Sequence, residues 1–125
     1  MKKIYITNAF SINMLTDSST LRFQRLSVEE VKEALDQYDV TSCVGHLDTA
    51  HVFSSVLGHE IPMNRTTVEM DPETALIIGQ YSGPRLAEGT MSLPKGATIE
   101  WWFVTHRYGV EYADLKWPFR LQPRV

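Results

Sequence analysis

The sequence has few of the features that would place it in a specialised class of protein. It contains one cysteine, Cys43, so no disulfide can form within the chain, and one thiolate does not make a zinc site. No run reaches the roughly 18 apolar residues of a membrane span, and the first residues resemble a strand instead of a signal peptide. We therefore expect a cytoplasmic protein that does not enter a membrane, with Cys43 buried among apolar neighbours.

Positive charge is also scarce. The 12 Lys and Arg residues are outnumbered by 15 Asp and Glu, which gives a net charge of −3 at pH 7. Proteins that coat long nucleic acids make many Lys and Arg contacts to phosphate, so this balance argues against that class. A small phosphorylated ligand, held in one pocket by two or three arginines, remains compatible with it.

What is present is typical of one ordinary globular domain. The chain has 125 residues, of which 43% are hydrophobic and 22% charged, and it contains no internal repeat or long linker. We expect a single domain over residues 1–125, with a core at about 2–106. Residues 107–125 contain two prolines and form a C-terminal extension.

Hydrophobic patterning predicts strands interspersed with helices, and hence an α/β fold: one mixed sheet of about five strands flanked by helices. Ser27 and Glu30 form a capping box that begins the first helix, which ends between Asp36 and Tyr38. Asp48 or Thr49 can cap a second helix. Apolar or alternating runs predict strands at residues 2–7, 21–26, 40–45, 66–70, 74–81 and 98–106.

The four histidines do not have metal-binding spacing. His46 and His51 are five residues apart, so they lack the i, i+4 spacing of two metal ligands on a helix. His59 is followed closely by a proline and has no such partner either. We expect no bound metal and no cofactor. His51 and His59 are expected at the surface, and His106 is expected to have a structural role at a strand end.

Three places in the sequence could bind an anion: His46, the pair of Arg85 and Glu88, and Asn64-Arg65. His46 lies where a buried strand leads into a helix, and α/β proteins bind ligands at such junctions, although taken alone a histidine there is more simply the end of a strand. Arg85 and Glu88 are close enough in a loop rich in Gly and Pro to form a salt bridge that orients the guanidinium, or a solvated surface pair. Asn64-Arg65 precedes a predicted strand and offers a further phosphate ligand.

Together these segments resemble the viral and bacterial type III anti-CRISPR ring nucleases. The resemblance rests on NAFSINML after the first strand, Gly45-His46 before a helix, Asn64-Arg65, and Gln80 followed by RLAEG at 85–89. It spans about residues 2–106. The chain departs from the pattern in its tail and in Gly83-Pro84, which lengthens the segment between Gln80 and Arg85.

The resemblance implies a homodimer that binds cyclic tetra-adenylate (cA4) and switches off type III CRISPR signalling. It would cleave cA4 without a metal to linear di-adenylate with a 2′,3′-cyclic phosphate. In a virus, it would act in the host cytoplasm. By position, the catalytic residues would be His46, Arg85 and Glu88, and the ligand-binding residues would be Asn8, Ser11, Asn13, Arg65 and Gln80.

The same resemblance gives the mixed segment TNAFSINML, residues 7–15, a function. We expect it to turn from the first strand into a short helix, with its polar residues facing the ligand. Its apolar residues would anchor it to the core: Phe10, Ile12, Met14 and Leu15.

The residue chemistry suits such a reaction. Histidine titrates near neutral pH, so His46 can protonate the leaving 5′-oxygen, while Arg85 and Arg65 hold the phosphate and Glu88 orients Arg85. The sequence offers no strong general base, so we expect alignment of the 2′-hydroxyl with the phosphorus to contribute much of the rate.

Two other functions remain open. The same domain could bind a cyclic nucleotide without cutting it, as a sponge or sensor. It could also be a structural or protein-interaction domain that uses its aromatic residues, Trp101, Trp102, Trp117 and Phe119.

Overall fold

Two long neighbouring strands form the centre of the sheet. The structure, a computed structural model, describes residues 3–106. Within them, β4 (Thr74–Ser82) pairs antiparallel with β5 (Thr98–His106) from Ala75 opposite Thr105 to Ser82 opposite Thr98. Residues 74–79 of β4 are all buried, as expected for a strand covered on both faces. Both strands confirm the prediction from the sequence.

Three shorter strands complete a five-stranded mixed sheet in the order β2-β5-β4-β1-β3. They are β1 (Lys3–Thr7), β2 (Leu21–Leu26) and β3 (Val40–Ser42). β1 runs parallel to both β3 and β4, and β2 pairs antiparallel with β5. The α/β prediction is confirmed, and β3 ends three residues earlier than expected.

Both helices pack on one face of the sheet. α1 (Val28–Gln37) begins at the predicted capping box, in which Ser27 and Glu30 satisfy each other's backbone N–H groups. α2 (Leu47–Leu57) ends at Gly58, whose φ of 65° favours glycine. The core between helices and sheet includes Phe53, Ile77 and Trp101. Neither helix in the described part of the chain is long and apolar enough to cross a membrane.

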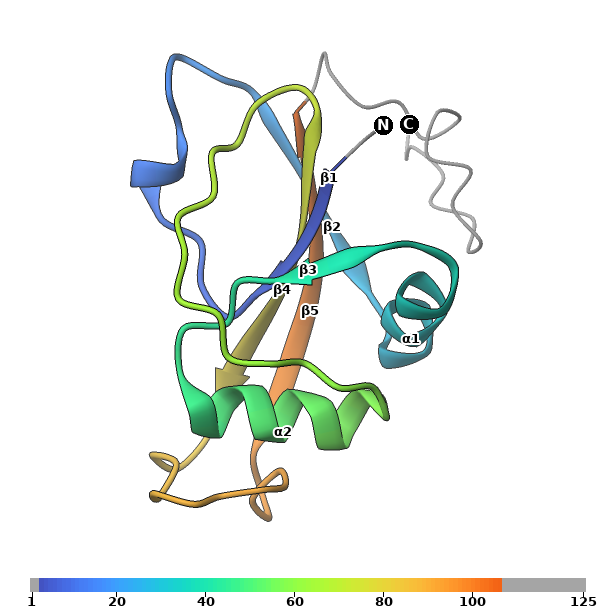
Figure 1. Ribbon diagram of the computed structural model, residues 1–125, viewed down its shortest axis with the longest axis vertical. Helices are drawn as coiled ribbons and strands as arrows, with labels where there is room; N and C mark the ends of the chain where they lie inside the picture. The colour runs from blue at the N-terminus through green and yellow to red at the C-terminus, as the bar shows by residue number, and fades with distance from the viewer. Residues whose placement is uncertain (1–2, 107–125) are drawn as a thin grey trace.

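Two long loops cover the opposite face. In Figure 1 the blue and yellow-green segments, between β1 and β2 and before β4, lie on the side of the sheet away from α1. They bury Met70 and Val68 against Leu76, Ile78 and Val104 of the sheet. This second core explains how a single sheet buries both of its faces.

The predicted strand at 66–70 is wrong. The segment contains no strand, although Val68 and Met70 are buried and Thr67 and Glu69 are exposed. It lies on the face of the sheet, where the Met70 N–H donates to the Met14 carbonyl at 2.7 Å. An extended segment that lies flat on a sheet alternates in burial just as a strand within one does.

The predicted start of the second helix is also wrong. The N-cap is His46, with extended backbone angles, and not Asp48 or Thr49. His46 still fills the cap position, because its carbonyl accepts the Ala50 N–H at 3.0 Å. Asp48 is in the first turn instead, where a carboxylate is favoured by the helix dipole.

The adjacent tryptophans face opposite sides of β5, as strand geometry requires. Trp101 is buried against Phe53, with ring centroids 4.9 Å apart, on the helix side. Trp102 packs on the other face, where the Arg25 guanidinium lies 5.0 Å from its ring centroid. Trp117 and Phe119, also named as possible interaction residues, lie outside the described residues.

Gly79 should be intolerant of any side chain. A Cβ there would lie 2.5 Å from Trp101 Cζ3 and 2.6 Å from Phe53 Cζ, so two packed rings would have to move. We expect Gly79→Ala to lower the free energy of unfolding by about 1–3 kcal/mol, measured by urea denaturation. Gly45→Ala is the matched control, because its Cβ would meet only Arg65 Nε at 3.9 Å. Equal stability of the two variants would contradict this packing.

Cys43 should be unreactive in the folded protein. The residue is 7% exposed, and burial raises the pKa of its thiol. Little of the thiol is therefore in the nucleophilic thiolate form, and little of its surface is accessible to reagents. We expect a thiol-reactive dye to label the native protein far more slowly than the protein in denaturant at the same pH. Equal labelling rates would show that the end of β3 opens readily.

Candidate functional site

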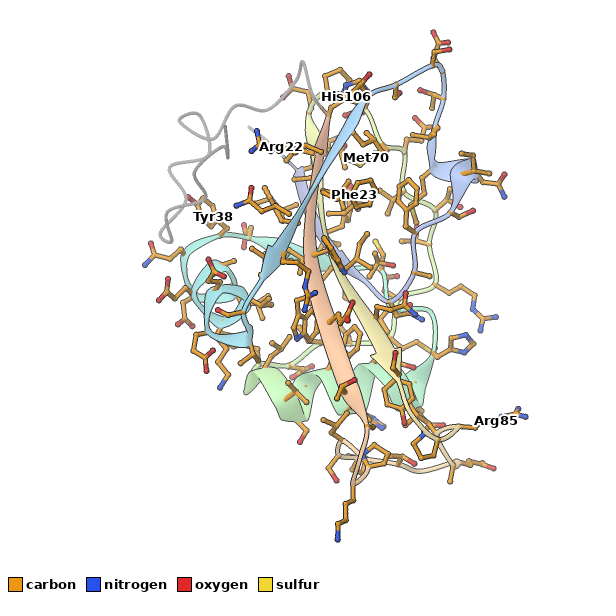
Figure 2. All side chains as sticks on the ribbon, turned by 180° about the vertical axis from the view of Figure 1, so that it is seen from behind. Arg22, Phe23, Tyr38, Met70, Arg85 and His106 are labelled. Carbon is orange, nitrogen blue, oxygen red and sulfur yellow. The ribbon has the colours of Figure 1, made fainter. Side chains whose placement is uncertain are left out.

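The carboxyl ends of the parallel strands lie at one edge of the sheet. Asn8 follows β1, His46 lies four residues beyond β3, and Arg85 follows β4. Figure 2 shows Arg85 at the opposite end of the sheet from His106, with its side chain pointing away from the body. Open α/β sheets bind ligands beyond the carboxyl ends of their strands, so this edge is the candidate site.

The peptide group of Gly45, just before His46, is held from two sides. Its N–H donates to Asn8 Oδ1 at 3.3 Å. Its carbonyl accepts from Arg65 Nε at 3.3 Å and Arg65 Nη2 at 3.0 Å. Asn8 and Arg65, both predicted as ligand contacts, therefore restrain the backbone that carries His46. The Nη1 donors of the exposed Arg65 are not used in these bonds.

His46 is exposed and begins α2 without a side-chain cap. Within residues 3–106 its imidazole makes no hydrogen bond, so both ring nitrogens can reach a ligand. The first N–H groups of a helix have no intrahelical partners, and the positive end of the helix dipole adds to their attraction for an anion. The position therefore combines an exposed imidazole with backbone donors suited to phosphate.

Polar side chains join the end of β3 to neighbouring segments through hydrogen bonds. The Thr7 hydroxyl donates to the Cys43 carbonyl at 3.3 Å, and the Ser42 hydroxyl donates to the Pro62 carbonyl at 2.6 Å. Asn64 Nδ2 donates to the Ser42 carbonyl at 2.7 Å. Asn64, proposed from sequence as a phosphate ligand, thus has its amide committed to the backbone.

The opening segment forms the predicted turn into a short helix, the 3₁₀ helix η1 (Ile12–Met14). Ser11 caps it, since its Oγ accepts the Asn13 N–H at 3.2 Å. Ser11 and Asn13 are exposed, while Phe10, Met14 and Leu15 pack on the sheet as expected. The prediction that Ile12 anchors the segment is wrong, because its side chain is 73% exposed.

The loop after β4 places Arg85 and Glu88 in solvent, and no ion pair joins them in the described structure. The salt bridge that their spacing allowed is thus not formed. Gln80, also exposed, precedes this loop on the face of the sheet that carries Trp102. It lines an open pocket of about 280 Å³ whose other walls are Phe10, Phe23, Ile78 and Trp102.

Exposed apolar residues flank the polar ones along the chain. Ile12 lies between Ser11 and Asn13, Leu47 follows His46, and Met63 is two residues before Arg65. These three side chains are 73%, 53% and 48% exposed. We call Ile12, Leu47 and Met63 the apolar rim.

Two of the other histidines contact neighbouring polar side chains. His59 Nε2 lies 3.0 Å from Asp36 Oδ1, and His106 Nε2 lies 3.2 Å from Ser19 Oγ. His51 and His59 are half-buried and not fully at the surface as expected. Among residues 3–106, no group of three or more His, Cys, Asp or Glu side chains could hold a metal ion.

Sequence reasoning missed one residue of this region. The Asp48 carboxylate accepts the Gly89 N–H at 3.1 Å, which joins the first turn of α2 to the loop that carries Arg85. The two residues are 41 positions apart, and an acidic residue near a helix start has a sufficient local explanation as a cap. No signal in a single sequence could have paired them.

Comparison with known proteins places these observations in a viral context. The STIV B116-like family model matches residues 4–97. Uncharacterized protein 26 of Sulfolobus islandicus filamentous virus is 29% identical over 117 residues, covering 87% of this chain and 98% of that protein. Uncharacterized protein ORF117 of Acidianus two-tailed virus is 29% identical over 91 residues, covering 69% and 74%.

A solved structure supports the same relationship. B116 of Sulfolobus turreted icosahedral virus superposes with a TM-score of 0.69 at 27% sequence identity. The match covers 83% of this chain and 99% of that one. The matched family region contains every candidate site residue named above.

Proposed function

This chain belongs to the STIV B116-like family, and from that premise we propose that it is a metal-independent ring nuclease acting on cyclic tetra-adenylate. It would bind cA4 as a homodimer in the cytoplasm of an infected host and cleave it to linear di-adenylate. Loss of this second messenger would switch off type III CRISPR signalling.

The observation that carries this proposal is the edge formed by the ends of β1, β3 and β4. The residues that resemble the ring-nuclease motifs come from four separate segments, and three of those segments follow these parallel strands. The fourth supplies Arg65, which bonds to Gly45 beside His46. The Asn8 side chain also bonds to Gly45, so three of the four segments meet directly beside His46.

The proposed reaction needs an acid for the leaving oxygen and positive charge for the phosphate, and residues at this edge would supply both. A ribose 2′-hydroxyl attacks the adjacent phosphorus and gives its proton to solvent water, a 2′,3′-cyclic phosphate forms, and the bond to the 5′-oxygen breaks. His46 gives a proton to that departing oxygen. Arg85 and the unused donors of Arg65 stabilise charge on the phosphate oxygens. Cleavage of two opposite linkages converts the ring to two di-adenylates.

A second copy of the chain fits both the ligand and the apolar rim. A four-nucleotide ring with two-fold symmetry presents equivalent phosphates on opposite sides, which matches two identical sites related by a dyad. Ile12, Leu47 and Met63 are exposed next to site residues in the sequence, and their burial by a second copy would stabilise a dimer. In this arrangement the dimer would enclose the ligand between two copies of the edge.

Loss of the imidazole should slow cleavage strongly and leave binding intact. We expect His46→Ala to reduce the rate of cA4 cleavage in EDTA by about 10²- to 10⁴-fold, because a general acid contributes that much. Labelled cA4 and its linear products are separated by chromatography, and binding is measured by co-elution. EDTA removes free divalent metal, so activity there tests the metal-independent reaction directly.

His59→Ala is the matched control, because His59 contacts Asp36 on α1 and should leave the rate unchanged. Full activity of His46→Ala would refute the acid role. Unchanged cA4 that co-elutes with the wild-type protein would instead show a sponge, and failure to bind cA4 would favour an interaction domain.

A charge on the apolar rim should prevent dimerisation. Burying an isoleucine contributes about 1.5–3 kcal/mol per copy, so Ile12→Glu should shift sedimentation from dimer to monomer at micromolar concentrations. Ile12→Val keeps the surface apolar and should remain dimeric. A monomeric wild-type protein, or a dimeric Ile12→Glu variant, would show that the rim is not the interface.

A further inference from the structure

The loop between β4 and β5 carries two of the proposed active-site residues, yet neither holds it in place. Arg85 and Glu88 are exposed and form no ion pair with each other in residues 3–106. His46 lies on a different segment, at the start of α2. An in-line reaction needs the acid and the phosphate-binding arginine in a fixed relation, so something must hold the loop against the helix.

The loop forms a turn at the required point. The Thr90 N–H donates to the Ala87 carbonyl at 3.1 Å, with Glu88 and Gly89 as the central residues. Gly89 has a φ of 85°, close to the value at the third residue of a type II turn, which favours glycine. The turn fixes the peptide that joins Glu88 to Gly89 and sets the direction of the Gly89 N–H.

That N–H donates to Asp48 Oδ1 at 3.1 Å. Asp48 is half-buried and lies two residues after His46, in the first turn of α2. A hydrogen bond to a carboxylate is stronger than one between neutral groups. The bond thus connects the residue next to Glu88 with the turn of helix next to His46.

The loop stays beside the helix after this point. Met91 lines an open groove of about 510 Å³ together with His51 and Ser54 of α2. In Figure 1 the orange loop runs beneath the first turns of α2, in agreement with the hydrogen bond from Asp48. The side chain of Asp48 is therefore placed between two segments that the proposed reaction uses.

We propose that Asp48 is a positioning residue, which holds the Ala87–Thr90 turn, and with it Arg85 and Glu88, against the helix that His46 begins. The proposal rests on the proposed function, since it assigns Asp48 a part in that reaction without contact to the ligand. The acceptor oxygen is the property that matters, and asparagine retains it while alanine does not.

The tether itself can be tested without any ligand. We expect Asp48→Ala to accelerate hydrogen exchange of the Gly89 amide, followed by NMR, by about ten- to a hundred-fold, as for loss of a hydrogen bond to a charged group. Asp48→Asn, which keeps an acceptor oxygen and loses the charge, should accelerate it much less than Asp48→Ala. The Ile77 amide, in the buried centre of β4, should be unchanged in both and reports that the fold is intact.

The positioning role is tested by the kinetics of cA4 cleavage. We expect Asp48→Ala to lower kcat by about ten- to a hundred-fold with KM nearly unchanged, and Asp48→Asn to restore most of the rate. Glu33→Ala, which removes an exposed negative charge on α1, controls for net charge and should have no effect.

A second pair of variants approaches the tether from the loop. Gly89→Ala and Gly96→Ala each place a methyl group in open space at a similar φ, 85° and 83°, so their intrinsic strain is alike. Only Gly89 bonds to Asp48, so only its substitution should slow cleavage strongly. Equal losses in the two glycine variants would overturn the proposal.

The remaining outcomes are also decisive. Fast exchange of the Gly89 amide in Asp48→Ala with unchanged kcat would overturn the positioning role, and so would equal losses in Asp48→Ala and Asp48→Asn. Wild-type protein that leaves cA4 intact would refute the proposed function together with this role. The exchange result would then show whether Asp48 still acts as a structural tether.

Discussion

The parallel pairing of β1 with both of its neighbours is the constraint on which the site depends. Because β3 and β4 run in the direction of β1, the chain leaves all three strands at one edge of the sheet. Segments that are far apart in sequence therefore begin their loops side by side. β5 runs antiparallel to β4 and carries the chain away from this edge, whereas β2, antiparallel to β5, has the same direction as β4. A polar ligand site here needs only suitable residues at three strand ends.

The weakest of these strands is the one that leads to His46. β3 has only three residues and is the outermost strand of the sheet, so it forms ladder hydrogen bonds with one neighbour alone, β1. Side chains supply the rest: Thr7 and Asn64 bond to its terminal carbonyls, while Asn8 and Arg65 bond to the Gly45 peptide. These polar residues therefore hold the segment that carries His46. Substitution of one of them would change the position of His46, and in the case of Arg65 it would also remove a side chain that we propose as a ligand contact.

Much of the fold could be predicted because local patterns and tertiary packing agree. The capping box at Ser27 and the β-branched and aromatic residues of β5 each favour one structure only. The segment 66–70 shows where this reasoning fails, since burial alternates along any extended chain that has one side on a surface. Motif resemblance proposes the site residues one by one. The bonds between their segments could not be predicted from the sequence, because Asp48 and Gly89 are 41 positions apart and meet only in the folded chain.

The unexpected start of α2 links stability to the proposed chemistry. Asp48 or Thr49 at the N-cap would satisfy a backbone N–H, whereas a helix without such a cap is less stable by about 0.5–2 kcal/mol. The chain begins the helix at His46 instead and uses the Asp48 carboxylate for the loop. The first-turn N–H groups consequently have no side-chain cap, and an anion bound at this helix start could accept from them. A small loss in helix stability thus leaves donors available at the one place where a phosphate would meet His46.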